Sequence, residues 1–191
     1  MKKQNPAIVY GLIGAAILIV FTLVTQMLIT SSMQKAVDSG QSMSPFKFLW
    51  VGIITFLLIA GVYIFFIIRT MKDYRKTNPQ YTYGKLGGQG LFVTLAIALV
   101  STGFSLLYSQ VIDPGAMKKN IELTEKVFDN MNMPEDQKEK ALERIRNQNP
   151  GRQAVGGLAV ALVCGLIVSL ISASVLNKKG KEFPSNPNNL S

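Results

Sequence analysis

The sequence contains no histidine and a single cysteine, Cys164. A closed zinc site draws its four ligands mainly from these two residue types, so the composition excludes a site of that kind. Ser-His-Asp and Cys-His nucleophilic centres are excluded as well, because both depend on an imidazole. A single thiol also excludes a disulfide within these 191 residues. Because Cys164 lies inside an apolar stretch, we interpret it as an unreactive packing residue.

Charged side chains are absent from four long stretches, which cover residues 7–30, 48–68, 91–112 and 154–176. Each stretch exceeds the roughly 20 residues that a helix needs to cross about 30 Å of hydrocarbon. In lipid, such a segment satisfies its backbone hydrogen bonds by forming a helix. We therefore expect an all-α integral membrane protein whose single membrane domain is a bundle of four transmembrane helices.

The formal net charge of +9 is distributed unevenly along the chain. Basic residues gather before the first stretch, between the second and the third, and after the fourth. The positive-inside rule then places the N-terminus, the second connection and residues 177–191, which we expect to form a flexible tail, in the cytoplasm. The same rule accounts for the basic excess without a nucleic-acid partner.

The basic residues of the second connection are candidates for contact with anionic lipid headgroups. They are Arg69, Lys72, Arg75, Lys76 and Lys85. Basic side chains at such a membrane surface each contribute about 1 kcal/mol of attraction to anionic lipid. We expect these contacts to anchor the protein on the cytoplasmic side.

The segment 84–90, which contains four glycines, superficially resembles a phosphate-binding loop. It matches neither the P-loop spacing nor the dinucleotide-binding fingerprint, and no predicted strand precedes it. We interpret the glycines as a turn at the membrane surface that also lets the third span approach a neighbouring helix.

The mixed charge of residues 114–148 predicts an extracytoplasmic helical hairpin between the third and fourth spans. Asp113 stands before Pro114, an order in which the carboxylate caps the first turn of a helix. An apolar stripe at helical spacing contains Met117, Ile121, Phe128 and Met131. Either this stripe closes the hairpin on the bundle, or it also docks a partner protein, since methionine-rich faces adapt well to partners.

The fourth stretch contains a ridge of small residues spaced four apart. Its members are Gly157, Ala161, Gly165, Ser169 and Ala173. Small residues at this spacing let two helices approach closely inside a membrane. The ridge predicts either packing within the bundle or a homodimer interface. A candidate partner row with the same spacing occurs in the third stretch, at Ser101, Ser105 and Ser109.

Three polar side chains, Gln26, Gln110 and Asp113, lie near the expected outer ends of the spans. They are the candidates for a polar site at the outer rim. For Asp113, the helix cap described above is the simpler role.

Four short segments resemble a known family. They are NPAIVYGLIG at 5–14, YGK at 83–85, YSQVIDPG at 108–115, and GLIVSLISA at 165–173 followed by NKK. In these segments the chain resembles the small bacterial membrane proteins catalogued as domain of unknown function 4199. The resemblance covers essentially the whole chain and implies four spans with a charged helical loop between the third and the fourth. It implies no activity for particular residues.

The spans contain no ionisable side chain, whereas ion- or proton-coupled carriers place such groups in the membrane interior. The acidic residues of 114–148 alternate with lysines, as on a solvated helix face, and this pattern favours neither an enzyme nor a cofactor site. We therefore expect a non-enzymatic scaffold, accessory or interaction subunit of the bacterial inner membrane. Its expected partners are anionic lipids and either another protein or a second copy of the chain. The alternative is a small transporter or channel subunit that acts as an oligomer.

Overall fold

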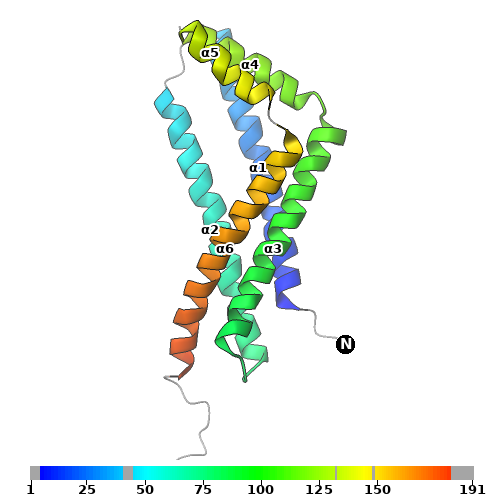
Figure 1. Ribbon diagram of the computed structural model, residues 1–191, viewed down its shortest axis with the longest axis vertical. Coiled ribbons are helices and arrows are strands. Elements are labelled where there is room, and N and C mark those ends of the chain that lie inside the picture. The colour runs from blue at the N-terminus through cyan, green and yellow to red at the C-terminus, as the bar shows by residue number, and fades with distance from the viewer. Residues whose placement is uncertain (1–4, 41–44, 132, 148, 182–191) are drawn as a thin grey trace, which may run out of the picture. The chain divides into compact units, whose positions relative to one another are not determined.

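The computed structural model describes residues 5–40, 45–131, 133–147 and 149–181, and within them it leaves out the side chains of residues 45–48, 116, 117 and 178–181. This part of the chain is helical and contains no strand. In chain order the elements are α1 (Pro6–Asp38), α2 (Pro45–Thr77), α3 (Tyr83–Leu107), the π-helical turn η1 (Tyr108–Ile112), α4 (Ala116–Asn130), α5 (Glu135–Arg146) and α6 (Pro150–Lys181) (Figure 1).

Four helical segments are long and apolar enough to cross a membrane. They are Pro6–Asp38, Leu49–Thr77, Tyr83–Ile112 and Pro150–Asn177. Large apolar side chains stay exposed along them, as Leu28, Phe56 and Val160 illustrate with exposed fractions of 64, 67 and 63 %. Side chains of this kind are stable in contact with lipid. The expectation of an all-α protein with four apolar spans is therefore confirmed.

Polar side chains cap the N-terminal ends of three of the four long helices. The side-chain oxygens of Asn5 and Asn149 accept hydrogen bonds from backbone N–H groups two residues later, at 3.1 and 2.9 Å, and each asparagine precedes a proline in the first helical position. Thr82 Oγ1 accepts a hydrogen bond from the Lys85 backbone N–H at 3.3 Å. These side chains satisfy N–H groups that have no partner within the helix, which fixes where α1, α3 and α6 begin.

Two segments in which we expected no helix, the glycine-rich segment and the start of the C-terminal tail, are helical in the structure. The glycine-rich segment 84–90 forms the first turns of α3, so the expected turn at this position is wrong. Thr82 caps the helix directly before its first residue, Tyr83. The close packing of Gly87 and Gly90 offsets the low helix propensity of glycine. At the other end of the chain, α6 continues through Lys181 and includes the start of the predicted tail 177–191, whereas residues 182–191 lie outside the description.

The expected helix cap at Asp113 is also corrected. Helix α4 begins at Ala116, and its N-cap residue is Gly115, which has no side chain to accept a hydrogen bond. Asp113 instead ends the preceding π-helical turn, because its backbone N–H donates to the Tyr108 carbonyl at 2.9 Å. The carboxylate thus stands in the connection between η1 and α4.

The chain divides into two compact units. The first contains Met1–Ala15, Ala60–Val100 and Leu158–Ser191, and the second contains Ala16–Ile59 and Ser101–Gly157. Each unit holds one segment of α1, α2, α3 and α6, and the second also holds η1, α4 and α5.

In the first unit, the core forms where α1, α2 and α3 meet. Ile67 and Met71 of α2 and Val93 of α3 are fully buried there. Helix α1 lies close to α3 because its small residues face it, and a Cβ atom on Gly11 would stand only 2.5 Å from the Ala96 Cβ. The glycine therefore sets how closely these two helices pack.

In the second unit, a small apolar core joins α1 to α4. It consists of Met33, Leu123 and Val127, and the partly buried Ile29, Val37 and Met131 pack against it. Helix α1 reaches this core because it continues to Asp38, well past the end of the apolar stretch 7–30. Its last turns thus form a surface on which α4 packs.

Candidate functional site

The small-residue ridge of α6 lies in two different environments. Gly165, Ser169 and Ala173 are buried in the first unit, whereas Ala161 is half-buried and Gly157, in the second unit, is exposed with open space where a Cβ would stand. Helix α6 approaches α3 at Gly165, where an added Cβ would lie 2.3 Å from Thr94 Cγ2. The buried half of the ridge is therefore in contact with α3.

Two further ridge residues, Ser169 and Ala173, lie near glycines of α3. A Cβ on Gly90 would lie 2.5 Å from Ser169 Oγ, and a Cβ on Gly87 would lie 4.0 Å from the Ala173 Cβ. These glycines belong to the segment in which a turn was expected, and as helical residues they provide the space for α6.

Cys164, the residue before Gly165, is exposed. Consecutive helical residues point about 100° apart, so the residue next to a buried glycine lies beside the contact with α3 rather than in it. The interpretation of Cys164 as a packing residue is therefore corrected.

Arg75, one of the five predicted lipid-contact residues, binds within the protein. Its Nη1 donates to the carbonyl oxygen of Leu176 in α6 at 3.0 Å, and its guanidinium lies 5.8 Å from the ring centre of Tyr81. Lys72 and Lys85 are exposed. The basic segment thus contains a residue that joins α2 to α6 and two whose side chains are directed to the surroundings.

Arg69 and Lys76, the other two, surround Asp73, which sequence reasoning missed. The Tyr10 hydroxyl of α1 donates a hydrogen bond to the Asp73 carboxylate. Arg69 Nε lies 3.6 Å and Lys76 Nζ lies 3.7 Å from the same carboxylate. Asp73 is the only acidic residue between positions 39 and 112, and this isolation among basic neighbours was the available signal.

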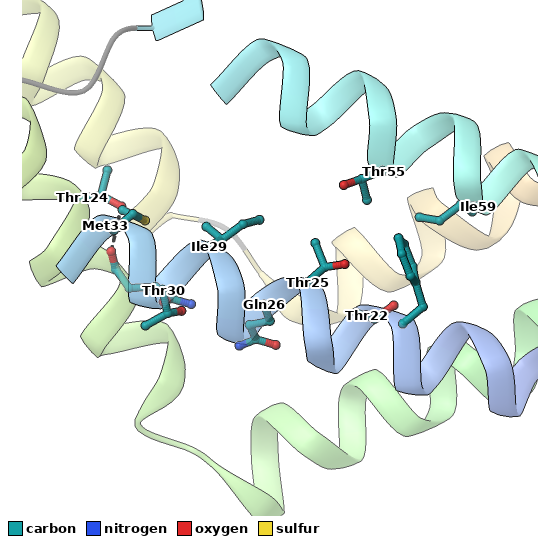
Figure 2. Close-up of a pocket in the computed structure, with 11 residues that line it drawn as sticks. Thr22, Thr25, Gln26, Ile29, Thr30, Met33, Thr55, Ile59 and Thr124 are labelled. Carbon is teal, nitrogen blue, oxygen red and sulfur yellow. Dashed lines mark hydrogen bonds between the residues drawn. The ribbon is translucent and has the colours of Figure 1, made fainter. Parts of the chain in front are cut away.

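A cavity of about 380 Å³ lies in the second unit between α1, α2 and α4 (Figure 2). Its polar lining consists of Thr22, Thr25, Gln26, Thr30, Thr55, Asn120 and Thr124. Apolar side chains such as Ile29 and Ile59 complete the wall, and none of the lining residues is ionisable. The volume lies within the range of small-molecule sites, and the mostly apolar lining without an ionisable group suits an uncharged ligand.

Of the three predicted outer-rim residues, Gln26 lines this cavity. Gln110 is exposed on η1 and Asp113 is half-buried after it, and neither is among the residues that line the cavity. The structure therefore does not bring the three together around it. The missed signal was the spacing of Thr22, Thr25 and Gln26, which places three polar side chains on one face of α1.

Helices α4 and α5 lie side by side and are joined by two ion pairs (Figure 1). Lys138 Nζ lies 2.5 Å from Asp129 Oδ1, and Arg146 Nη2 lies 3.5 Å from Glu125 Oε2. Leu142 of α5 is buried, with 5 % exposed. The outward face of α5 is charged and exposed, at Glu135, Asp136, Glu139, Lys140, Glu143 and Arg144.

The predicted docking stripe lies on α4. Met131 packs against the core that joins α1 to α4, whereas Ile121 and Phe128 are half-buried. The side chain of Met117 lies outside the description. The structure thus assigns one member of the stripe to packing on α1.

The pKa of Lys138 is raised above its ordinary value of 10.5, chiefly because the ammonium donates a hydrogen bond to Asp129 and also because nearby carboxylates attract it. A pKa that is higher in the folded state stabilises the protein fully below pH 10.5, and this stabilisation is lost as the pH rises through the raised value. We expect Lys138→Met to lower the melting temperature at neutral pH, and the difference from the parent protein to disappear at high pH.

Melting temperatures measured by circular dichroism across this alkaline range test the prediction. Lys140→Met is the matched control, because Lys140 is exposed on the same helix and has no ion pair among the described residues. If the difference in melting temperature between Lys138→Met and the parent protein persisted unchanged at the highest pH, the stabilisation would not come from the charge of Lys138.

Four long helices with outward-facing apolar side chains define an all-helical, multi-pass membrane protein. The chain belongs to the family described as Protein of unknown function (DUF4199), whose family model matches residues 9–178. This match confirms the resemblance found in the short sequence segments. No curated protein and no solved structure matches the chain.

Proposed function

We propose that the protein is a non-enzymatic accessory or scaffold subunit of the bacterial inner membrane, and that α4 and α5 form its partner-binding element. One observation carries this proposal. The pair is fixed to α1 through Met33, Leu123 and Val127, while the outward face of α5 remains charged and exposed. A rigidly held charged surface favours a specific protein partner of complementary charge.

The arrangement of the ionisable groups supports a non-enzymatic role without a cofactor. Asp129 and Glu125 of α4 are paired with basic residues of α5, and their side chains are 54 and 39 % exposed. General acid–base catalysis requires carboxylates whose pKa is tuned by burial or by a close neighbour of like charge. Solvated ion pairs between two helices serve instead to hold those helices together.

The proposed topology places α4 and α5 outside the cytoplasm and the basic end of α2 inside it. It can be tested with single cysteines introduced at Lys140 and Lys76 in a Cys164→Ser background. A membrane-impermeant maleimide is expected to label the cysteine at 140 in intact spheroplasts, and the one at 76 only after permeabilisation. The reverse pattern would overturn the orientation.

The proposed partner contact is tested by photocrosslinking in native membranes, with the crosslinker placed at Glu143. We expect one discrete protein adduct, and we expect Glu139→Lys, which reverses a charge one turn away, to abolish it. The matched control places the crosslinker at Phe56, an exposed position on α2 where lipid adducts are expected. An adduct at 143 that Glu139→Lys leaves unchanged would contradict recognition by this face.

The cavity favours a second candidate function, a transport subunit for a small uncharged solute that acts as an oligomer. Its wall is mostly apolar, with some hydroxyl and amide groups and no ionisable residue, so it suits a neutral solute rather than an ion. Osmotic swelling of proteoliposomes with neutral polyols provides the test. Swelling that Gln26→Leu suppresses would favour transport over the scaffold role, and swelling no faster than in protein-free liposomes would exclude transport of these solutes.

A further inference from the structure

The guanidinium of Arg69 is held from one side by residues of two helices. Its Nε donates to the Tyr10 hydroxyl oxygen at 3.3 Å and lies 3.6 Å from Asp73 Oδ2. Tyr10 in turn donates to Asp73, so α1 and α2 together fix the orientation of the group. The side chain of Arg69 nevertheless remains 50 % exposed.

The two terminal amino groups of Arg69 have no hydrogen-bond partner among the described residues. A guanidinium presents parallel N–H donors whose spacing matches two oxygens of a phosphate group. Because the contacts with Tyr10 and Asp73 already restrict the side chain, less conformational entropy is lost when a ligand binds. Arg69 therefore offers a preorganised donor pair on its exposed edge.

The position and charge of the surroundings favour one kind of ligand. Arg69 follows directly on the charge-free stretch 48–68, at the depth where hydrocarbon gives way to lipid headgroups. Lys72, one turn later, is exposed, and the Lys76 side chain is 74 % exposed. With Asp73 these residues carry three positive charges and one negative charge, a net charge of +2.

We propose that Arg69 and its neighbours form a binding site for the phosphate group of an anionic phospholipid. Arg69 binds two phosphate oxygens through its terminal amino groups, and Lys72 and Lys76 contribute positive charge. Tyr10 and Asp73 are positioning residues, because they act through Arg69 and do not touch the lipid. Such a site differs from diffuse attraction of a basic surface to the membrane, since it depends on the geometry of one side chain.

Replacing Asp73 distinguishes binding at a fixed guanidinium from diffuse attraction to a basic surface. If charge alone attracted the lipid, Asp73→Asn would strengthen binding, because it raises the local net charge from +2 to +3. If a fixed guanidinium is required, the same change weakens binding in spite of the added charge. Tyr10→Phe changes no charge at all and removes only the hydroxyl that contacts Arg69 and Asp73.

The experiment measures retention of phosphatidylglycerol by the purified full-length protein in phosphatidylcholine nanodiscs, with native mass spectrometry as the readout. We expect Asp73→Asn and Tyr10→Phe each to weaken retention several-fold, and Arg69→Lys, which keeps the charge but removes the donor pair, to weaken it roughly tenfold. The matched control is Lys35→Gln, which removes an exposed basic residue in the last turn of α1, outside this basic segment, and it should change retention little.

Three results would overturn the proposal. The first is tighter binding by Asp73→Asn together with unchanged binding by Tyr10→Phe, which would indicate diffuse attraction. The second is unchanged binding by Arg69→Lys, a variant that keeps the positive charge and is measured alongside its melting temperature. The third is displacement of the lipid by millimolar inorganic phosphate together with phosphate binding by lipid-free protein, which would assign the site to a soluble phosphate compound.

Discussion

Replacing Gly165 with alanine is expected to destabilise the packing of α6 on α3 by about 1–3 kcal/mol, as overpacking of a close contact does. The added Cβ would stand 2.3 Å from Thr94 Cγ2, 2.6 Å from its Oγ1 and 2.9 Å from its Cβ. The Thr94 Cβ is attached directly to the backbone, so rotation of the side chain cannot relieve the clash. The two helices must separate instead, and the contacts around Ser169 and Gly90 loosen with them.

The midpoint of unfolding in sodium dodecyl sulfate, followed by far-ultraviolet circular dichroism, measures this effect. Gly157→Ala is the matched control on the same helix, because nothing lies within 4 Å of the position of its Cβ. That variant should be neutral or slightly stabilising, since alanine has the higher helix propensity. Adding Thr94→Ala to Gly165→Ala removes two of the three close atoms but keeps the Cβ at 2.9 Å, so it should restore part of the lost stability. Equal stability of Gly165→Ala and Gly157→Ala would refute the packing account.

Replacing Val127 with aspartate is expected to detach α4 and α5 from α1. Val127 is 3 % exposed and packs with Met33 and Leu123, so the change places an unpaired carboxylate in an apolar core. An uncompensated buried charge costs about 3–5 kcal/mol. Because α4 can expose the new carboxylate by leaving α1, we expect local separation rather than unfolding of the apolar spans.

Limited trypsin digestion of the purified protein tests this expectation. Cleavage within α4 and α5 should become at least tenfold faster in Val127→Asp, while the helical content of the spans is largely retained. Lys126→Asp introduces the same residue at the neighbouring exposed position and should leave the core intact, apart from removing one cleavage site. If Val127→Asp resisted trypsin as well as the parent protein does, this core would not be what holds α4 and α5 on α1.

The apolar spans were predictable because the signal is local. A run of more than roughly 20 residues without charge can satisfy its backbone in lipid only as a helix, whatever its neighbours are. The second helix of the charged segment was also visible, because Glu135 and Asp136 stand in its first turn, where the helix dipole favours acidic residues. These features needed no knowledge of tertiary contacts.

The glycine-rich segment 84–90 shows where local reasoning fails. Gly87 and Gly90 are compatible with a turn as well as with a helix, and the decision rests on contacts with α6, which lies far along the chain. The contacts around Asp73 could not be predicted from the sequence either, because Tyr10 lies 63 residues before it. The sequence showed an isolated acid, but its partner on α1 becomes visible only when the helices are assembled.

The outward position of Cys164 has a practical consequence. It lies inside an apolar span, where lipid excludes water, so we expect it to resist water-soluble alkylating agents in native membranes. The protein therefore carries one natural attachment point for a nonpolar spectroscopic probe, directly beside Gly165. Such a probe would report on the separation of α6 from α3 without any introduced cysteine.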